Sequence, residues 1–380
     1  MDFEPITESG PLVAELRARI ARDGPITFRD FMDAALYHPL YGYYSTHSGA
    51  MTRVGDYVTS PEVHPVFGAL VARQIREMWD VMSRPERFDV VEAGGGTGAL
   101  ARDVLRSQAA REPEFAAALR YRIVERSEAL ARAQRATLVE AGVDVGAVDW
   151  GGTLPRGITG CVLSNELLDA LPVHRVVRSG GELREVYVTV EGRRFADTLG
   201  PLSDEALRRP FDDVGALPGE GCYAEVGLDA VAWMRDAARS VERGYVLTFD
   251  YGYEARELYA PWRRDGTLLC FYRQTASSDP YQRIGKQDMT ASVDFTALRG
   301  AGEAEGLRTL GWTDQAAFLT RLGIAEGVAA AARDAGQMEE YFARRRVVLD
   351  LLDPARLGRV KVLLQGRGVP DAALRGFSDA

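Results

Sequence analysis

Short apolar runs alternate with segments of helical spacing through the middle of the chain. The run at 88–91 is too short for a helix and predicts a buried strand of a parallel sheet, and residues 99–107 predict the helix after it. Further runs predict four more strands, at 121–125, about 143–148, 160–164 and 244–250. Strands that alternate with helices in this way are typical of an α/β domain with a mostly parallel sheet.

The remaining segments predict additions around that core. Helical spacing before it predicts helices over 11–22, 28–36 and 60–81, the last with Ser60 as its N-cap. A long insertion between the fourth and fifth strands should lie at the carboxyl edge of the sheet. We therefore expect four segments: an N-terminal helical cap at 1–82, a Rossmann-like core at 83–171, an inserted lid or substrate region at 172–243, and the rest of the core at 244–380. The last segment should contain C-terminal helices and an edge strand at 360–364.

The first predicted strand ends in Glu92, and a glycine turn follows at once. Gly94, Gly96 and Gly98 allow a tight turn and let the backbone approach a ligand without a Cβ in the way. The N–H groups at the start of the next helix then favour negative charge. With Ala99, these glycines also satisfy the dinucleotide pattern, so they do not by themselves separate a dehydrogenase from a methyltransferase.

Two further features favour S-adenosylmethionine (SAM) over a dinucleotide at this turn. A carboxylate at Glu92 would repel a pyrophosphate, whereas it can accept a hydrogen bond from the cationic amino group of SAM. About ninety residues also precede the motif, whereas a dinucleotide fold usually opens with it. A turn that binds no ligand is the third interpretation of the same glycines.

A second acid, Glu125, closes the second predicted strand ahead of a helix that begins at Ser127. In nucleoside-binding folds an acid at this position accepts hydrogen bonds from both ribose hydroxyls, and the alternative is a solvated glutamate. Asp149 and Trp150, placed after the third predicted strand, are candidates for a hydrogen bond and a stacking face for adenine, although a tryptophan is more often part of a core.

Composition and charge limit the classes of binding partner that we expect. The chain has 380 residues, a net charge of −9 and a pI near 5.2, and no basic stripe alternates with aromatic residues. We expect no nucleic-acid binding, and an acidic surface suits a cationic partner. No targeting segment or membrane-spanning run stands out, and three widely spaced cysteines favour neither disulfides nor a metal centre. We expect a cytoplasmic protein of a reducing compartment.

Five longer motifs occur in a characteristic order. They are FMDAALYHPLYGYY at 31–44, GDYVTSPE at 55–62, NELLDALPVH at 165–174, DYG at 250–252 and DMTASVDF at 288–295. Through them nearly the whole chain resembles the MidA-type SAM-dependent methyltransferases, a family that includes a mitochondrial arginine methyltransferase of complex I assembly. The resemblance implies a class I methyltransferase fold with an N-terminal cap and an inserted lid, SAM as cofactor and, in the mitochondrial member, methylation of a protein arginine.

The chain also departs from the family pattern. Gly95 stands where the family's turn usually carries proline, which should loosen the loop without removing the site. Ser292 and Gln274 stand where the family tends to carry histidines. If those histidines contact substrate in the family, this chain acts on a different acceptor.

Asn165 and Glu166 are the candidate catalytic residues, because they follow the fourth predicted strand, whose end faces the transferred methyl group in this fold. Glu166 can bind a guanidinium through two hydrogen bonds or orient an amine or hydroxyl, and Asn165 can accept from an N–H. The alternative for Asn165 is a helix cap. His174 is a candidate base for a hydroxyl acceptor, with a core histidine as the alternative.

In the cap, Asp56, Ser60 and Glu62 are predicted cofactor contacts, although Ser60 also suits a plain helix cap. The sequence thus favours a SAM-dependent methyltransferase acting on a protein or peptide, with arginine as one acceptor, or on a small-molecule N or O nucleophile. A non-catalytic assembly factor that retains SAM is the second class, and a dinucleotide oxidoreductase is the third. We expect a protein, peptide or small-molecule substrate as partner, no nucleic acid and no membrane, and a homodimer is compatible with the sequence.

Overall fold

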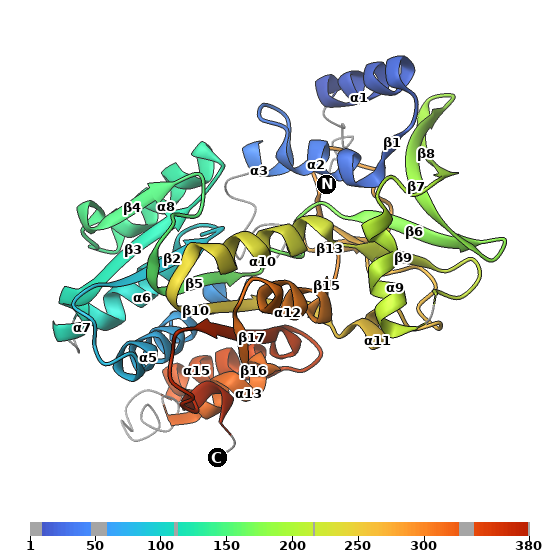
Figure 1. Cartoon of the computed structure of the whole chain (residues 1–380). Coiled ribbons are helices and arrows are strands. Elements are labelled where there is room, and N and C mark those ends of the chain that lie inside the picture. The colour runs from blue at the N-terminus through green and yellow to red at the C-terminus, as the bar shows by residue number, and fades with distance from the viewer. Residues whose placement is uncertain (1–9, 47–58, 110–112, 216, 327–337, 379–380) are drawn as a thin grey trace.

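The computed structural model describes residues 10–46, 59–109, 113–215, 217–326 and 338–378. A seven-stranded sheet in the order β16-β17-β10-β5-β2-β3-β4 forms its centre (Figure 1). The strands, in chain order, are β2 Phe88–Ala93, β3 Leu119–Val124, β4 Val148–Gly151, β5 Ile158–Asn165, β10 Val241–Asp250, β16 Arg308–Asp314 and β17 Lys361–Arg367. The predicted α/β fold is confirmed.

The strands of this sheet run in one direction from β4 to β10, and β17 pairs antiparallel with both β10 and β16. The prediction of an edge strand at 360–364 is therefore wrong, because β17 has a partner on each side. The expected C-terminal helices are present as α12 Phe295–Ala304, α13 Gln315–Arg321 and α15 Met338–Leu352, but β16 lies among them and was not predicted. A register shift between Thr309 and Gly311 interrupts the alternation of β16, which hides the strand in the sequence.

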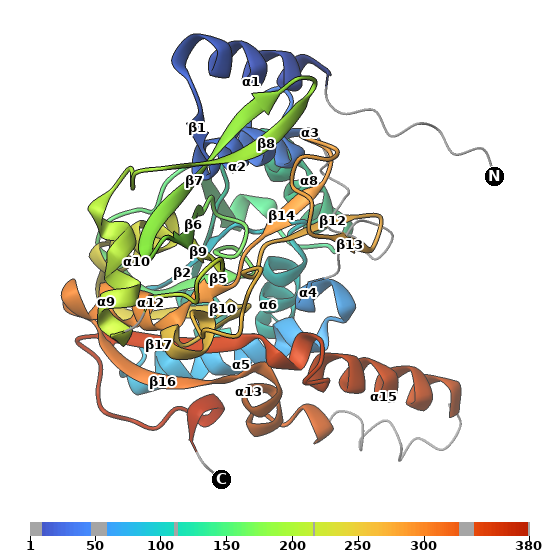
Figure 2. The ribbon, with the colours of Figure 1, turned by 90° about the vertical axis from the view of Figure 1, so that its right-hand side faces the viewer.

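Helices cover the sheet in two layers (Figures 1 and 2). On one side, buried residues of α5 Val66–Val81, α6 Ala99–Ala109, α8 Glu128–Glu140, α13 Gln315–Arg321 and α15 Met338–Leu352 share one core with the strands. On the other side, α10 Leu228–Ser240 and α12 Phe295–Ala304 pack on β5, β10 and β17. The apolar stripe of each helix supplies these contacts. No helix in the described ranges has the length and apolar character to cross a membrane.

The N-terminal cap consists of short helices: α1 Gly10–Asp23, α2 Phe28–Tyr37, α3 Tyr43–Thr46 and α4 Ser60–Val63. Thr27 caps α2, since its side chain accepts from the Asp30 N–H. The prediction of one helix over 60–81 is wrong, because Pro65 separates α4 from α5 and proline cannot continue a helix hydrogen-bond ladder. Thr59, not Ser60, is the N-cap residue of α4.

The insertion forms a second sheet in the order β1-β7-β6-β9, with β8 paired to β7. Its strands are β1 Ile26–Thr27, β6 His174–Ser179, β7 Glu182–Glu191, β8 Arg194–Gly200 and β9 Tyr223–Val226. Because β1 belongs to the N-terminal cap and pairs with β7, cap and insertion share one sheet and one hydrophobic core. Figure 2 shows them together at one end of the molecule, above the carboxyl ends of the central strands.

Candidate active site

The strand order of the central sheet reverses between β2 and β5, which lie side by side. In open α/β sheets, ligands bind outside the carboxyl ends of the strands at such a point. In this chain, the point of reversal brings together the glycine turn after β2 and the Asn165-Glu166 pair at the end of β5. A cavity of about 480 Å³ and a smaller one of about 40 Å³ open at this edge, and Gly94, Gly96 and Glu166 line both.

The glycine turn needs its glycines. Gly94, Gly96 and Gly98 have φ angles of +70°, +52° and +88°, which side chains rarely adopt. A Cβ at Gly94 would lie 2.7 Å from Leu167 Cδ1. At Gly95, where the family pattern has proline, a Cβ would lie 2.8 Å from Ile123 Cγ2, so a larger residue would require Ile123 to move. The tight turn predicted from the sequence is confirmed.

Glu92 is buried at the floor of the smaller cavity. The Tyr121 hydroxyl donates to Glu92 Oε2 at 2.6 Å, and burial raises the pKa of Glu92 to about 7. A cation in this cavity would stabilise the ionised carboxylate. Tyr121, which the sequence analysis did not assign to the site, lies on β3 beside β2, and only strand pairing brings it there.

Glu125 lines the larger cavity just beyond the end of β3. Its Oε1 accepts from the Ser127 N–H at 2.8 Å and its Oε2 from Gln134 Nε2 at 3.1 Å, while burial raises its pKa. Gln134 also donates to the Gly96 carbonyl and accepts from Trp150 Nε1, both at 3.1 Å. Gln134 therefore holds the turn and Glu125 in fixed relation. No sequence signal marked it, because a glutamine on a helix is usually solvated.

The third strand begins later than predicted. Residues 145–147 form a short 3₁₀ turn, and β4 holds Asp149 and Trp150 within the strand rather than after it. Successive side chains of a strand point to opposite faces. Trp150 therefore reaches Gln134, whereas Asp149 accepts from Arg122 Nε at 2.7 Å on the outer face. Neither residue lines the two cavities at the glycine turn.

Asn165 ends β5, and Glu166 follows in a left-handed conformation with a φ of +50°. The Glu166 N–H donates to the Phe249 carbonyl at 2.8 Å, and Glu166 Oε1 accepts from Asn165 Nδ2 at 3.1 Å. Asp250 Oδ2 accepts from the N–H groups of Leu167 and Leu168 at 3.1 and 2.7 Å, which fixes this turn. No helix follows Asn165 in this described stretch, so the helix-cap interpretation is wrong.

Three more acids, Asp169, Asp250 and Asp288, lie behind Glu166, outside the lining of the two cavities. Burial, and then the charges of Asp250, Glu166 and Asp288, raise the pKa of Asp169 well above its ordinary value. Tyr37 and Tyr44 line the larger cavity next to these acids: the Tyr44 hydroxyl donates to Asp288 Oδ1 at 2.7 Å, and Tyr37 donates to the Ala170 carbonyl at 3.0 Å. The aromatic segment of the cap thus forms one wall of the cavity.

The cap closes over the smaller cavity through α4. The Ser60 N–H donates to Glu166 Oε1 at 3.0 Å, and its buried hydroxyl donates to Gln315 Oε1 at 2.9 Å. Glu62 accepts from the Thr97 hydroxyl and lines the smaller cavity. Asp56 lies outside the described residues. Of the predicted cofactor contacts, Glu62 therefore lies at the glycine turn, whereas Ser60 lines neither cavity and contacts Glu166 through its backbone.

Three sequence candidates lie elsewhere. His174 is on β6, with Nδ1 2.7 Å from the buried Glu185 carboxylate, and lines neither cavity, so it is placed as a satisfied polar residue of the insertion sheet. The Ser292 N–H donates to Thr267 Oγ1, and Gln274 lies in the turn between β12 Leu269–Tyr272 and β13 Thr275–Ser277. Neither of these lines the cavities.

The strand order, the glycine turn after the first core strand, and acids at the ends of the first two core strands define a nucleoside-binding fold of the class I methyltransferase type. The chain belongs to the family of S-adenosyl-L-methionine-dependent methyltransferases whose model matches residues 70–313. A crystal structure of a superfamily member from Burkholderia thailandensis, bound to S-adenosyl-homocysteine, is 33% identical, with a TM-score of 0.89 over 100% of this chain and 97% of that one.

Curated relatives belong to the same family. A Drosophila melanogaster protein, named protein arginine methyltransferase NDUFAF7 homolog, mitochondrial, is 32% identical, and the alignment covers 96% of this chain and 87% of that protein. The Homo sapiens protein arginine methyltransferase NDUFAF7, mitochondrial, is 26% identical over 83% of this chain and 74% of its own. The protein is a SAM-dependent methyltransferase, as the sequence predicted.

Proposed function

We propose that this methyltransferase acts on a protein or peptide, with an arginine guanidinium as the acceptor. The observation that carries the proposal is the position of Glu166, whose carboxylate lines both cavities and lies beside Asp169 and Asp250. Among the described residues, no lysine or arginine forms an ion pair with these three acids. A guanidinium presents parallel donors that match a carboxylate, so it fits such a site better than a neutral nucleophile does.

The residues divide the work between cofactor and acceptor. SAM supplies an electrophilic methyl group. We propose that Glu92 accepts from its amino group, that Glu125 accepts from its ribose, and that the turn at Gly94–Gly98 gives the backbone close access. Glu166 and Asn165 would then orient the acceptor nitrogen, and the Glu166 carboxylate would receive the proton that this nitrogen loses. The raised pKa of Glu166, which burial causes, suits a group that takes up a proton near neutral pH.

We further propose that the insertion and the cap act together as a lid over the acceptor. Two contacts support this role. The Ser127 hydroxyl, beside Glu125, donates to the Tyr44 carbonyl of the cap at 3.0 Å, and β1 of the cap pairs with β7 of the insertion. A lid of this kind would exclude water from the reacting groups.

We also propose, from the composition, that the protein works in a reducing cytoplasm.

Methyl transfer from tritiated SAM in a lysate of the source organism tests the acceptor. The lysate is separated into macromolecular and small-molecule fractions, and labelled protein is hydrolysed to its amino acids. The proposal expects label on methylarginine. Label confined to small molecules would refute the protein acceptor and favour a small N or O nucleophile, whereas base-labile label would identify a carboxylate. SAM binding with no transfer to any fraction would favour the non-catalytic assembly factor.

A further inference from the structure

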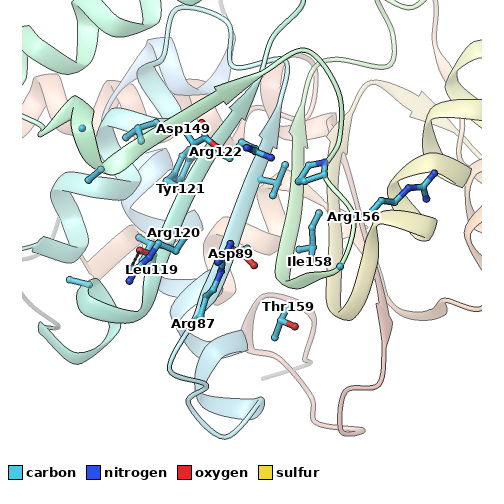
Figure 3. Close-up of a pocket in the computed structure, with 17 residues that line it drawn as sticks. Arg87, Asp89, Leu119, Arg120, Tyr121, Arg122, Asp149, Arg156, Ile158 and Thr159 are labelled. Carbon is cyan, nitrogen blue, oxygen red and sulfur yellow. Dashed lines mark hydrogen bonds and ion pairs between the residues drawn. The ribbon is translucent and has the colours of Figure 1, made fainter.

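One face of the central sheet lacks a helix where parallel sheets usually carry one. The connection from β4 to β5 spans residues 152–157 and contains no helix, although crossovers between parallel strands are usually longer and helical. On the opposite face α6 and α8 make the other crossovers, and on this face α10 and α12 pack over β5, β10 and β17. The face over β2, β3 and β4 is left as an open groove of about 970 Å³ (Figure 3).

The lining of this groove is mixed and carries an excess of positive charge. Its charged residues are four arginines against two aspartates, namely Arg87, Arg120, Arg122, Arg156, Asp89 and Asp149, which leaves +2 on a chain whose net charge is −9. The apolar residues of its strands, Val91, Val148 and Ile158, are already buried, whereas Ala116, Ala147 and Pro155 are partly or fully exposed. Figure 3 shows the charged side chains arrayed across neighbouring strands.

The two aspartates are already paired, whereas two of the arginines are not. Asp89 accepts from Arg87 at 2.9 Å, and Asp149 accepts from Arg122 at 2.7 Å. Arg120 is exposed and donates only to the carbonyls of Ala117 and Leu119, and Arg156 is exposed; neither forms an ion pair with a described residue. Two guanidinium groups therefore remain available at the groove for an acidic partner.

We infer that this groove docks an acidic amphipathic helix of a partner protein, in the layer where a crossover helix would otherwise lie. A partner strand cannot add to the face, because β3 is hydrogen-bonded to β2 and β4 on both edges. A helix can cover Ala116, Ala147 and Pro155 with its apolar stripe and set carboxylates against Arg120 and Arg156. A nucleic-acid backbone fits less well, because Asp89 and Asp149 would face its phosphates.

The docking surface is separate from the active site. Arg87 immediately precedes β2 and Arg156 lies just before β5, whereas Glu92 and Glu166 lie at the other ends of the same strands. An occupant of the groove would therefore not displace SAM, and the inference stands independently of the acceptor proposed above.

Fluorescence anisotropy on the full chain tests the docking. The probe is a labelled helical peptide of about 18 residues, roughly 27 Å long, with leucines at i, i+3, i+4 and i+7 spacing and glutamates at its polar positions. Two further peptides carry glutamine or lysine in place of glutamate. We expect the glutamate peptide to bind at low salt about tenfold more tightly than the glutamine peptide, and salt to weaken it.

A double variant, Arg120→Glu with Arg156→Glu, should weaken the glutamate peptide about tenfold and gain affinity for the lysine peptide. Arg209→Glu is the matched control, because Arg209 is an exposed arginine at the start of α9 Arg209–Val214, at the opposite side of the molecule in Figure 1. Unchanged SAH affinity and Tm in the double variant show that the fold is intact.

Four results would overturn the inference: no binding of the glutamate peptide by the wild type, equal binding by the double variant, equal loss in Arg209→Glu, or an oligonucleotide of matched length that binds as tightly through the same arginines. Analytical ultracentrifugation of the wild type and the double variant tests one further occupant. A wild-type dimer that the double variant converts to monomer would also overturn the inference, because it would assign the face to a second copy of the chain.

Discussion

The two ends of strands β2 and β5 carry opposite chemistry. At the carboxyl ends, Glu92 and Glu166 line the cavities at the glycine turn, and burial raises their pKa values. At the amino ends, Asp89 is paired with Arg87 in an open groove. Exposed charges can pair at little net gain, whereas buried carboxylates without a cation keep a cost that a cationic ligand relieves. Burial of the carboxylate and the absence of a paired cation, more than residue type, therefore separate the ligand site from the docking face.

The largest expected effect is on turnover and concerns Glu166. Glu166→Gln keeps the shape of the side chain and removes its charge, so we expect methyl transfer to fall by about 100-fold or more while SAH affinity stays within about twofold. Glu182→Gln, an exposed glutamate of β7, is the control. Equal losses of turnover and SAH binding would assign Glu166 to the cofactor pocket.

Gly98 and Gly142 form a matched pair for the glycine turn. Both have positive φ angles, +88° and +72°, but a Cβ at Gly98 would lie 3.0 Å from Gln134 Cα, whereas nothing lies within 4 Å of one at Gly142. Gly98→Ala should lower the free energy of unfolding by about 1–3 kcal/mol and SAH affinity by about tenfold or more. Gly142→Ala should cost about 1 kcal/mol and leave SAH affinity unchanged; urea unfolding and calorimetry measure both.

Removing Glu125, the proposed ribose acid, should weaken SAH binding by about the free energy of two hydrogen bonds. Glu125→Ala is expected to weaken SAH about tenfold, because charge-assisted bonds contribute about 1.5–3 kcal/mol each before water compensates. Calorimetry with SAH measures the change. Unchanged affinity would remove Glu125 from the ribose site.

The pH dependence of cofactor binding should follow Glu92. Its pKa rises from 4.5 to about 7 in the folded protein, so between these values the unfolded chain loses its proton first and stability falls as pH rises. A bound ammonium group needs the ionised form. SAH affinity and the Tm gain from SAH should therefore increase from pH 6 to pH 8, affinity by up to about tenfold. Glu92→Gln should flatten this profile, and a profile that persists would place the titrating group elsewhere, with Glu166 and Asp250 next to test.

The smallest effect is expected on the outer face. Asp149→Asn removes an exposed ion pair with Arg122, so the free energy of unfolding should change by less than about 1 kcal/mol and SAH affinity by less than about twofold. Thermal melting and calorimetry measure these. A tenfold loss of SAH affinity would restore Asp149 to the adenine site.

Local patterns in the sequence determined the α/β core, the glycine turn and the acids that follow the first two core strands, because strand periodicity and backbone freedom depend on neighbouring residues. The Asn165-Glu166 pair was also found, since it directly follows a strand end. These features carried the methyltransferase assignment without any knowledge of long-range contacts.

Only the tertiary structure decided which side chains complete the site. Gln134 and Tyr121 reach the acids through helix docking and strand pairing, and Asp250 fixes the turn of Glu166 across two strands. Asp149 lies within β4, on its outer face, because the strand starts a few residues later than predicted. The sheet face without a helix was also decided by the tertiary structure. The six-residue connection between β4 and β5 is too short to place a helix there, and whether another element covers the face depends on how the elements pack.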